Sequence, residues 1–500
     1  MLYRGECGLI ASITATSPAQ MLRDAKQALA GGADGVELRL DCLDQPDKAD
    51  LESLVRELGE RCIITLRPVY EGGRYDGDEA DRVSLLLKAA QGDPAFVDFE
   101  CAHYRRSANI RQKIRLAAGE SGLILSLHDF EGRPAKLLST VKEMIGEQAA
   151  LKVAWKARHI LDNFEAFELL RSVGRPMIAL CMGEEGILSR VLAGKFGALG
   201  TYCSLQPGSE SGPGQLTLAE MKELYRFHAI NAETEVYGVV GWPVAHSMSP
   251  AIFNAAFERT GANAVYLPMP VQPSEEWFRD FVREVLARPW LDMRGLSVTL
   301  PHKEHAFRLC RSALDEVSLR SGAVNTLTIA GDKVAGMNTD GPAALEALTA
   351  VLDCEAVDLR GIGVDVLGAG GAARAVAAAL RAHGCRVTVF NRTPERAKEL
   401  AEALGCEARP WEERAGRRGL VLINCTSVGM WPQADQTPMP IQGLKSGGTV
   451  FDAVYNPTRT RLLSDAEACE CRTVSGLEMF IRQAAAQFEA WTGRQAPKAL

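Results

Sequence analysis

The chain has 500 residues, of which 47% are hydrophobic, and its formal net charge is −7. A chain of this length exceeds what one hydrophobic core supports, so two or three domains are expected. The small net charge, without a long run of one sign, argues against a nucleic-acid-binding surface, and no apolar stretch is long enough to span a bilayer.

The cysteines are scattered through the chain. There are 13 of them, no C-x-x-C occurs, and Cys469 and Cys471 form the only close pair. This pattern predicts reduced, mostly buried thiols in a cytoplasmic protein, and neither a disulfide framework nor a zinc site. Residues 1–8 carry no signal-peptide pattern.

The first half alternates short β-rich runs with amphipathic helical runs. The predicted strands are residues 8–14, 35–40, 62–66, 96–99, 123–127, 151–154, 177–181 and 200–204. The predicted helices between them include residues 19–30, 51–58, 80–90 and 164–172. Eight strands that alternate with helices predict an α/β fold of the (β/α)₈ barrel type, a TIM barrel.

Such a barrel carries its chemistry at the C-terminal ends of its strands. The candidate residues at or beyond those ends are Glu37, Arg39, Arg67, Glu100, His128, Lys152, Arg190, Ser211 and Gln215. Strand alternation places Glu37 and Arg39 on one face, which is either the interior or the exterior of the barrel. One lysine, one histidine and several arginines suit an anionic carbonyl substrate. The lysine can form a Schiff base, and the histidine can transfer a proton near neutral pH.

Taken one at a time, these residues have ordinary explanations. Lys152 could lie solvated at a strand edge, and Glu37 and Arg39 could form a barrel ion pair. Together with the surrounding motifs, however, these residues match the pattern of a known enzyme family. These motifs are E-L-R-L-D at 37–41, E-G-G-R-Y-D-G-D-E at 71–79, L-S-L-H-D-F at 125–130, L-K-V-A at 151–154, G-I-L-S-R at 186–190 and S-G-P-G-Q at 211–215.

With these motifs, residues 1–225 resemble type I 3-dehydroquinate dehydratase. The resemblance implies that Lys152 forms the imine, that His128 is the general acid and base, and that Glu100 orients His128. It also implies a set of residues that hold the carboxylate and hydroxyls of the substrate, namely Glu37, Arg39, Arg67, Arg190, Ser211 and Gln215. Lys156 stands where the family has a small residue. It could lower the pKa of Lys152, or it could point outward.

The joint between the two halves is short. Residues 220–228 are predicted to form a helix that closes the barrel, and residues 229–235 form a polar linker. A loop with the sequence G-W-P-V-A-H-S-M-S-P then joins a strand to a helix at 251–259. Ser247 and Ser249 lie beside that helix start, where they can bind a carboxylate or where one of them can serve only as an N-cap.

A lysine and an aspartate follow in the next motifs. In L-S-V-T-L-P-H-K at 296–303, a strand ends at Thr299 and a helix that begins at Pro301 carries Lys303. Asn325 precedes the next strand, and Asp340 comes after it. Lysine and aspartate together can polarise and protonate a carbonyl oxygen while hydride arrives. A surface salt bridge is the alternative.

A dinucleotide fingerprint begins with a strand at Val364. It is G-x-G-x-x-A, from Gly368 through Gly370, Gly371 and Ala372 to Ala373, with a helix after it and a second strand at 386–390. Gly368 permits the tight turn, and Gly370 lets backbone N–H groups approach a pyrophosphate at the helix N-terminus. The alternative is a glycine turn without a ligand.

The end of the second strand indicates which dinucleotide is bound. A carboxylate there would hold the ribose 2′-hydroxyl of NAD, but this chain has Asn391, Arg392 and Thr393, followed by Arg396. Arginine offers a planar fork to a 2′-phosphate. The sequence therefore predicts NADP(H).

Residues 236–495 resemble shikimate dehydrogenase. Further matching motifs are I-N-C-T-S-V-G-M at 423–430, D-A-V-Y-N-P at 452–457 and G-L-E-M-F-I-R-Q at 476–483. The resemblance implies that Lys303 and Asp340 are catalytic. It implies shikimate contacts at Ser247, Ser249, Thr299, Asn325, Tyr455 and Gln483. It implies cofactor contacts at Gly368, Gly370, Gly371, Ala372, Asn391, Arg392, Thr393, Arg396 and Thr426, with the nicotinamide near Gly476 and Met479.

The expected organisation is a barrel at 1–228, a linker at 229–235, a substrate domain at 236–340 completed by 476–500, and a Rossmann-like NADP domain at 341–475. The two resemblances together imply a bifunctional enzyme that dehydrates 3-dehydroquinate to 3-dehydroshikimate and then reduces this ketone to shikimate with NADPH. No metal, nucleic acid or membrane partner is expected. Two alternatives stay open: a preference for quinate or NAD, and one half that serves only as an inactive scaffold.

Overall fold

The computed structural model describes residues 6–119, 122–310 and 314–497. The first five residues of the expected barrel domain and the last three of the C-terminal segment lie outside these ranges. The chain divides into two compact units, Met1–Glu235 with Asn263–Pro270, and Val236–Ala262 with Val271–Leu500. Within the described ranges, no helix combines the length and the apolar character needed to cross a bilayer.

The first unit contains the predicted barrel. Its strands are β1 (Gly8–Ile13), β2 (Gly35–Arg39), β3 (Cys62–Thr65), β4 (Phe96–Glu100), β5 (Gly122–Asp129), β6 (Ala150–Lys156), β7 (Met177–Met182) and β8 (Gly200–Ser204). They form one parallel sheet in the order β7-β6-β5-β4-β3-β2-β1-β8. The Leu199 N–H donates to the Met177 carbonyl at 2.8 Å, which brings the two edge strands together and nearly closes the barrel. The predicted (β/α)₈ architecture is confirmed.

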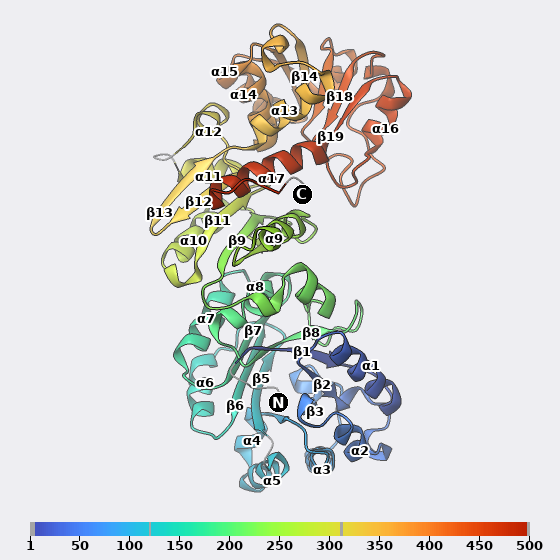
Figure 1. Cartoon of the computed structure of the whole chain (residues 1–500), viewed down its shortest axis with the longest axis vertical. Helices are drawn as coiled ribbons and strands as arrows, with labels where there is room; N and C mark the ends of the chain where they lie inside the picture. The colour runs from blue at the N-terminus through green and yellow to red at the C-terminus, as the bar shows by residue number, and fades with distance from the viewer. Residues whose placement is uncertain (1–5, 120–121, 311–313, 498–500) are drawn as a thin grey trace. The chain divides into compact units, whose positions relative to one another are not determined.

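Helices surround these strands on the outside, as Figure 1 shows in blue to teal. They are α1 (Pro18–Ala30), α2 (Leu51–Arg56), α3 (Glu79–Ala90), α4 (Cys101–Arg106), α5 (Ala108–Ala118), α6 (Leu137–Ile145), α7 (Asp162–Ser172) and α8 (Ile187–Val191). Helix α1 shows how the sequence specifies these helices. Ser17 caps its N-terminus by accepting from the Gln20 N–H, and Met21, Ala25 and Ala28 form its buried stripe.

The barrel interior is apolar at one level and polar at the next. Ile10, Ile63, Ile124 and Ile178 belong to one buried cluster. Two residues further along three of these strands, the interior positions are Ser12, Thr65 and Ser126, all buried. Because strand side chains alternate with a period of two, this polar level lies one step nearer the C-terminal strand ends, where the candidate site is expected.

The prediction of a single helix at 220–228 is wrong. Residues Glu220–Leu224 form one π-helical turn, and Phe227–Ala229 form a separate 3₁₀ turn. Arg226 lies between the two turns with a φ of 50°, in the left-handed region that a right-handed helix cannot include.

The second unit begins with a mixed sheet of β9 (Glu235–Gly241), β11 (Met293–Val298), β12 (Thr326–Ala330) and β13 (Lys333–Met337). Strand β11 is parallel to β9 and antiparallel to β12, and β12 and β13 form a hairpin. The helices of this part are α9 (Ser249–Thr260), α10 (Glu275–Leu286), α11 (Lys303–Leu309) and α12 (Glu316–Ser321). Strand β10 (Ala264–Pro270) is grouped with the first unit.

The rest of the second unit is a doubly wound parallel sheet in the order β16-β15-β14-β17-β18-β19. Its strands are β14 (Gly363–Leu367), β15 (Arg386–Asn391), β16 (Glu407–Pro410), β17 (Val421–Asn424), β18 (Thr449–Asp452) and β19 (Arg472–Ser475). Its helices are α13 (Asp340–Leu352), α14 (Gly371–Ala382), α15 (Pro394–Leu404) and α16 (Arg461–Ala468). The strand order reverses at β14, and ligands of such sheets bind at this switch point. The predicted Rossmann-like sheet is confirmed.

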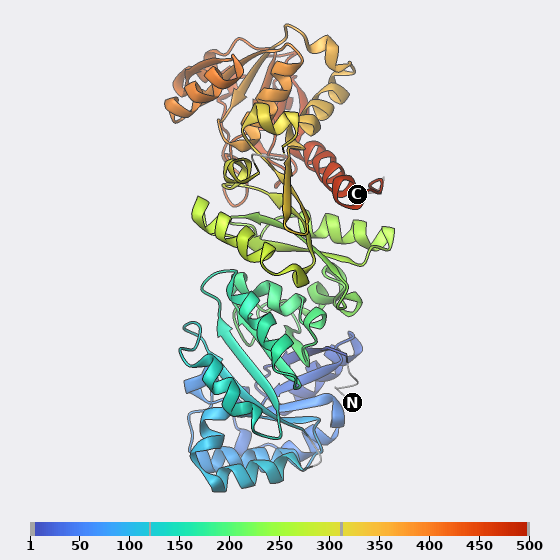
Figure 2. The same cartoon turned by 90° about the vertical axis from the view of Figure 1, so that its left-hand side faces the viewer.

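The C-terminal helix α17 (Gly476–Thr492) connects the two sheets of this unit. It follows β19 directly and also contacts α13, β11 and β12, and it is the long red helix of Figures 1 and 2. Near its end, the indole N–H of Trp491 donates to the Leu327 carbonyl at 3.0 Å. The helix therefore ties the nucleotide sheet to the mixed sheet.

Candidate functional site

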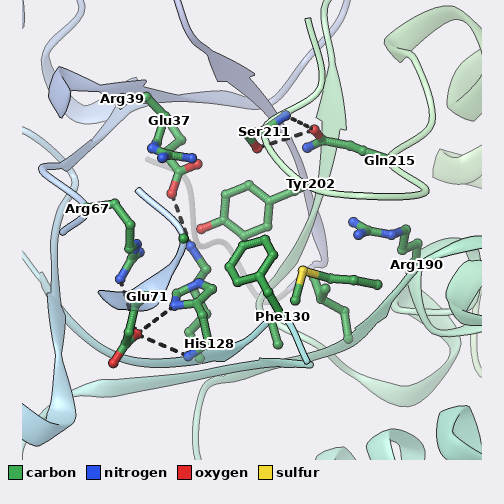
Figure 3. A pocket seen from close by; sticks show the side chains of 16 residues that line it. Glu37, Arg39, Arg67, Glu71, His128, Phe130, Arg190, Tyr202, Ser211 and Gln215 are labelled. Carbon is green, nitrogen blue, oxygen red and sulfur yellow. Dashed lines mark hydrogen bonds and ion pairs between the residues drawn. The ribbon is translucent and has the colours of Figure 1, made fainter. Parts of the chain in front are cut away.

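A cavity opens at the C-terminal strand ends of the barrel (Figure 3). It is lined by all the predicted barrel residues except Glu100, namely Glu37, Arg39, Arg67, His128, Lys152, Arg190, Ser211 and Gln215. The face that Glu37 and Arg39 share is thus the interior one. Phe130, Met182 and Tyr202 add apolar surface to the same cavity.

Lys152 is held between two carboxylates. Its Nζ lies 3.0 Å from Glu37 Oε1 and 3.0 Å from Asp98 Oδ2, and the side chain is 5% exposed. Burial alone would lower the pKa of Lys152, but Asp98 and Glu37 raise it above its ordinary range. The resting lysine is therefore an ammonium ion, and it must give up a proton before it can attack a carbonyl. Lys156, by contrast, is exposed at the end of β6.

The two carboxylates are themselves fixed by hydrogen bonds. Glu37 accepts from the hydroxyls of Ser12 and Thr65, each at 3.0 Å. Asp98 accepts from Arg67 at 2.8 Å and from Ser126 at 2.6 Å. Although burial acts to raise it, Arg67 and Lys152 hold the pKa of Asp98 below its usual range. Both groups thus remain ionised and position the lysine.

His128 pairs with Glu71, which corrects the expectation that Glu100 orients it. Its Nδ1 lies 3.1 Å from Glu71 Oε2, and the same oxygen accepts the backbone N–H of His128 at 3.1 Å (Figure 3). Burial raises the pKa of Glu71 to about 8. Burial, together with the charges of Arg67 and Lys152, lowers the pKa of His128 well below its ordinary value.

Glu100 lies outside the cavity lining because two arginines bind it. Its Oε1 accepts from Arg67 and its Oε2 from Arg82, each at 2.6 Å. Both arginines are buried, so this carboxylate balances buried positive charge and fixes Arg67 rather than contacting a substrate.

The other side of the cavity offers a cation and an amide. Among the described residues, the buried Nε of Arg190 has no hydrogen-bond partner, and burial lowers the pKa of this side chain to about 10. Its Nη2 donates to the Pro213 carbonyl at 3.1 Å. Gln215 Oε1 accepts from the Ser211 backbone N–H at 2.8 Å, which orders the loop around the opening. An arginine without a carboxylate partner suits an anionic substrate.

Sequence reasoning missed Glu71, Asp98 and Tyr202. Glu71 opens one of the quoted motifs, four residues after Arg67, and could have been considered as the partner of a catalytic histidine. Asp98 precedes Glu100 by two residues in β4, so alternation places both on one face. Tyr202 gave no signal, because a tyrosine in a strand is ordinarily a core residue.

In the second unit, Lys303 and Asp340 form an ion pair from the first turns of α11 and α13. Asp340 Oδ1 also accepts from Asn325 Nδ2 at 2.8 Å. Asn325 Oδ1 in turn accepts the Thr339 backbone N–H at 2.8 Å. Three of the predicted residues, distant in sequence, therefore meet at one point.

The predicted substrate contacts near the two serines also cluster. Ser247 accepts from the Ser249 backbone N–H at 3.2 Å. Burial raises the pKa of Tyr455, and a hydrogen bond with Ser247 opposes that rise. Tyr455 stacks on Phe480 of α17 at 4.2 Å, and Gln483 of the same helix donates to the Phe480 carbonyl at 3.0 Å.

Thr299 follows β11 directly and packs against Gly241 at the end of β9. A Cβ at position 241 would lie 2.3 Å from the Thr299 side chain, so only glycine fits there. The threonine is thus held beside the loop that carries the two serines.

The glycine turn after β14 has the geometry that the fingerprint predicts. Gly368 has a φ of 108°, and α14 begins at Gly371 without a side-chain cap on its first N–H groups. Ala372 lies in that first turn. A Cβ at Gly371 would lie 2.7 Å from Lys303 Cβ, so the turn packs against the lysine. A Cβ at Gly368 would lie 3.4 Å from the Thr426 side chain, which places that loop beside the turn as well.

The predicted ribose-phosphate contacts lie at the end of β15. Asn391 Nδ2 donates to the Thr393 carbonyl at 2.9 Å, and Arg392 is exposed. Arg396 contacts Glu304, the neighbour of Lys303, at 2.8 Å. Both arginines are thus on the surface, next to the turn.

The start of α17 is packed tightly. A Cβ at Gly476 would lie 2.5 Å from the Val454 carbonyl oxygen, and Met479 belongs to the buried core of the nucleotide sheet. These residues place α17 close to the loop after β18, which carries Tyr455.

Comparisons with known proteins agree with both halves. Residues 9–232 match the family model for type I 3-dehydroquinase. Residues 239–327 match the substrate binding domain of shikimate dehydrogenase, residues 352–415 match shikimate / quinate 5-dehydrogenase, and residues 476–500 match the shikimate 5′-dehydrogenase C-terminal domain.

Individual relatives cover either the whole chain or its second half. The chloroplastic bifunctional 3-dehydroquinate dehydratase/shikimate dehydrogenase of Arabidopsis thaliana is 36% identical over 98% of this chain and 83% of its own length. The shikimate dehydrogenase (NADP(+)) of Moorella thermoacetica is 42% identical over 54% of this chain and 92% of its own. A crystal structure of the Thermus thermophilus shikimate 5-dehydrogenase with NADP(H) and shikimate is 37% identical, covers 53% of this chain and 96% of its own, and has a TM-score of 0.47.

Both the family models and a relative of nearly full length place a dehydratase barrel and a shikimate dehydrogenase on one polypeptide. The chain belongs to the family of bifunctional 3-dehydroquinate dehydratase/shikimate dehydrogenases.

Proposed function

We propose that the chain catalyses two consecutive reactions, the dehydration of 3-dehydroquinate to 3-dehydroshikimate and the reduction of this ketone to shikimate with NADPH. The observation that carries the proposal is the presence of two separate, complete sets of reactive groups. Lys152 with His128 lies in the barrel, and Lys303 with Asp340 lies in the second unit.

In the barrel, Lys152 is the nucleophile. Its amine attacks the substrate ketone, and the resulting imine withdraws electrons from the neighbouring carbon. His128, neutral in its buried position, removes a proton from that carbon and then helps the hydroxyl to leave as water. Arg190 and Arg39 hold the carboxylate, and Ser211 and Gln215 bind hydroxyls. Glu37 and Arg67 keep the lysine and the carboxylates in place. No metal is required, because the imine serves as the electron sink.

In the second unit, the carbonyl of 3-dehydroshikimate lies beside the ion pair of Lys303 and Asp340. The ammonium of Lys303 polarises and protonates the oxygen, while Asp340 orients the lysine and Asn325 orients Asp340. Ser247, Ser249, Thr299, Tyr455 and Gln483 hold the acid and its hydroxyls.

The residues of the nucleotide sheet suit NADP(H), which supplies the hydride. The first N–H groups of α14 have no side-chain cap and can bind the pyrophosphate, with Gly368, Gly370, Gly371 and Ala372 forming the close turn. Asn391, Arg392, Thr393 and Arg396 offer donors to the 2′-phosphate. Thr426, Gly476 and Met479 line the nicotinamide end. The Moorella relative is named for NADP(+), which supports the same choice.

The proposed organisation follows the chemistry. The barrel at 1–228 carries dehydration, 229–235 is a linker, 236–340 with 476–500 binds the acid, and 341–475 binds NADP(H). The partners are small molecules, with neither nucleic acid nor a membrane. A cytoplasmic location, expected from the scattered thiols, stays a prediction, since the Arabidopsis relative is chloroplastic.

Two measurements on the purified chain test the proposal. Incubation with 3-dehydroquinate and borohydride should reduce the imine and leave a covalent adduct on Lys152, located by mass spectrometry. NADPH oxidation should follow the addition of 3-dehydroshikimate. A chain that forms no adduct on Lys152, or forms it on Lys156, contradicts the dehydratase assignment. If the chain oxidises NADH with 3-dehydroquinate, the ketone of quinate, in preference to NADPH with 3-dehydroshikimate, the dehydrogenase assignment is contradicted.

A further inference from the structure

Tyr202 lies in the dehydratase cavity beside the imine-forming lysine, and the roles described above leave it unused. It belongs to β8 and is 5% exposed. Lys152 Nζ lies 4.1 Å from the centre of its ring. Figure 3 shows the ring directed into the cavity beside Phe130. The phenol is therefore next to the atom that forms the covalent bond.

The hydroxyl of Tyr202 is buried, and within the described ranges Lys152 is the group that acts on it as a hydrogen-bond donor, without the geometry of a full hydrogen bond. Other polar groups around the lysine are paired, since Ser12 and Thr65 donate to Glu37, and Ser126 donates to Asp98. A buried hydroxyl whose hydrogen bonding is incomplete costs stability, and such groups are found where a ligand completes the hydrogen bonding. Burial raises the pKa of Tyr202, although Lys152 opposes the rise, so the group remains a neutral phenol that can both donate and accept.

Imine formation at this site needs a carrier of protons. The lysine ammonium and the ketone combine to give a protonated imine and one molecule of water. Two of the three protons on Nζ must therefore move to the oxygen that leaves, while the N–C bond forms and the C–O bond breaks. Glu37 and Asp98 are held ionised by the charges around them, so they steady the ammonium but are weak bases.

We propose that the hydroxyl of Tyr202 carries these protons between Nζ of Lys152 and the carbonyl oxygen of the substrate. This inference rests on the proposed dehydratase function. In each transfer the phenol gives its proton to the oxygen and takes one from nitrogen, so Tyr202 ends unchanged. The first transfer gives the carbinolamine, and the second releases water. The same path in reverse hydrolyses the product imine. His128 is then left to act on the carbon next to the imine.

Two substitutions distinguish the role of the Tyr202 hydroxyl from that of its ring. Tyr202→Phe keeps the aromatic face over the ammonium and removes only the oxygen, whereas Tyr202→Leu removes both. If the ring alone matters, as a wall of the cavity or as a partner of the cation, the phenylalanine variant keeps the wild-type rate of imine formation and only the leucine variant loses it.

The test is a rapid-quench experiment on the full chain. The enzyme is mixed with 3-dehydroquinate and quenched with borohydride at increasing times, and the fraction of Lys152 that carries the adduct is measured by mass spectrometry. Tyr202→Phe should form the adduct about 10²-fold more slowly than the wild type, the effect typical of a lost acid–base group. The isotope effect from substrate deuterated at the carbon beside the ketone should also fall toward unity in the variant, because imine formation then limits the rate. Reduction of added 3-dehydroshikimate should be unchanged, which reports an intact chain.

Adduct formation in Tyr202→Phe at the wild-type rate overturns this inference and leaves the dehydratase assignment standing. A wild-type chain that forms no adduct on Lys152 overturns both.

Discussion

His128 Nδ1 and Glu71 Oε2 lie 3.1 Å apart at the edge of the dehydratase cavity. Because Glu71 is buried, its pKa rises to about 8, while burial and two neighbouring cations lower the pKa of His128. Near neutral pH the carboxyl therefore keeps its proton and the imidazole is uncharged. The pair stores one proton beside a base that can accept another, which suits a reaction that removes a proton from carbon and returns one to a leaving hydroxyl.

This pairing gives dehydration a specific pH dependence. As the pH rises through about 8, the raised-pKa carboxyl of Glu71 loses its proton, so the dehydration rate should fall on the alkaline side. Glu71→Gln cannot lose that proton. It should lack this alkaline limb and be slower by roughly 10²-fold near neutral pH. The measurement is kcat against pH for both proteins. An unchanged alkaline limb in the glutamine variant would show that another group titrates there.

The contact between Gly371 and Lys303 predicts a steric effect on reduction. A methyl group at position 371 would lie 2.7 Å from Lys303 Cβ, which is too close to be accommodated without moving the lysine. Gly371→Ala should therefore lower kcat for the reduction of 3-dehydroshikimate, by about 10²-fold if the lysine moves about 1 Å. Gly416→Ala is the matched control, since a Cβ there meets nothing within 4 Å. Equal rates of reduction in the two variants would mean that Lys303 tolerates the displacement. The rate of dehydration should be normal in both variants.

The exposed Arg392 predicts cofactor selectivity. Only NADPH carries the 2′-phosphate, so Arg392→Ala should raise KM for NADPH far more than for NADH. A charge-assisted hydrogen bond contributes about 1.5–3 kcal/mol, which corresponds to roughly a ten- to hundred-fold change in affinity. Lys398→Ala removes another exposed cation, on α15, and should leave both constants near wild type. Equal losses for the two cofactors would assign Arg392 a structural role.

Most of the architecture could be predicted because its signals are local. Alternation and helical periodicity located all eight barrel strands, and the glycine turn located the switch point between β14 and β17. The helix at 220–228 failed because periodicity does not reveal that Arg226 adopts a left-handed φ. Such a conformation depends on tertiary packing rather than on the residue type.

The candidate sites were predictable where a motif carried the residue and not where only closure of the barrel brings residues together. Lys152, His128, Lys303 and Asp340 stand in recognisable motifs. Glu100 was assigned to His128 by the family resemblance, but the histidine turns toward Glu71 in the loop after β3. Tyr202 approaches Lys152 only because closure of the barrel brings β8 beside β7, so that β6 and β8 become next-but-one strands. This relation between residues 50 positions apart is not encoded by any local pattern.

The independence of the two sites is tested most directly by the initial rates of both half-reactions on single-lysine variants. Lys152→Ala should abolish dehydration and reduce added 3-dehydroshikimate at close to the wild-type rate. Lys303→Ala should dehydrate 3-dehydroquinate normally, reduce poorly, and release 3-dehydroshikimate into solution. Lys156→Ala, which removes the exposed lysine four residues beyond Lys152, should keep both rates. Sites without shared partners are expected to act additively. If either Lys152→Ala or Lys303→Ala, shown by circular dichroism to be folded, loses both activities, the account of two independent sites is contradicted.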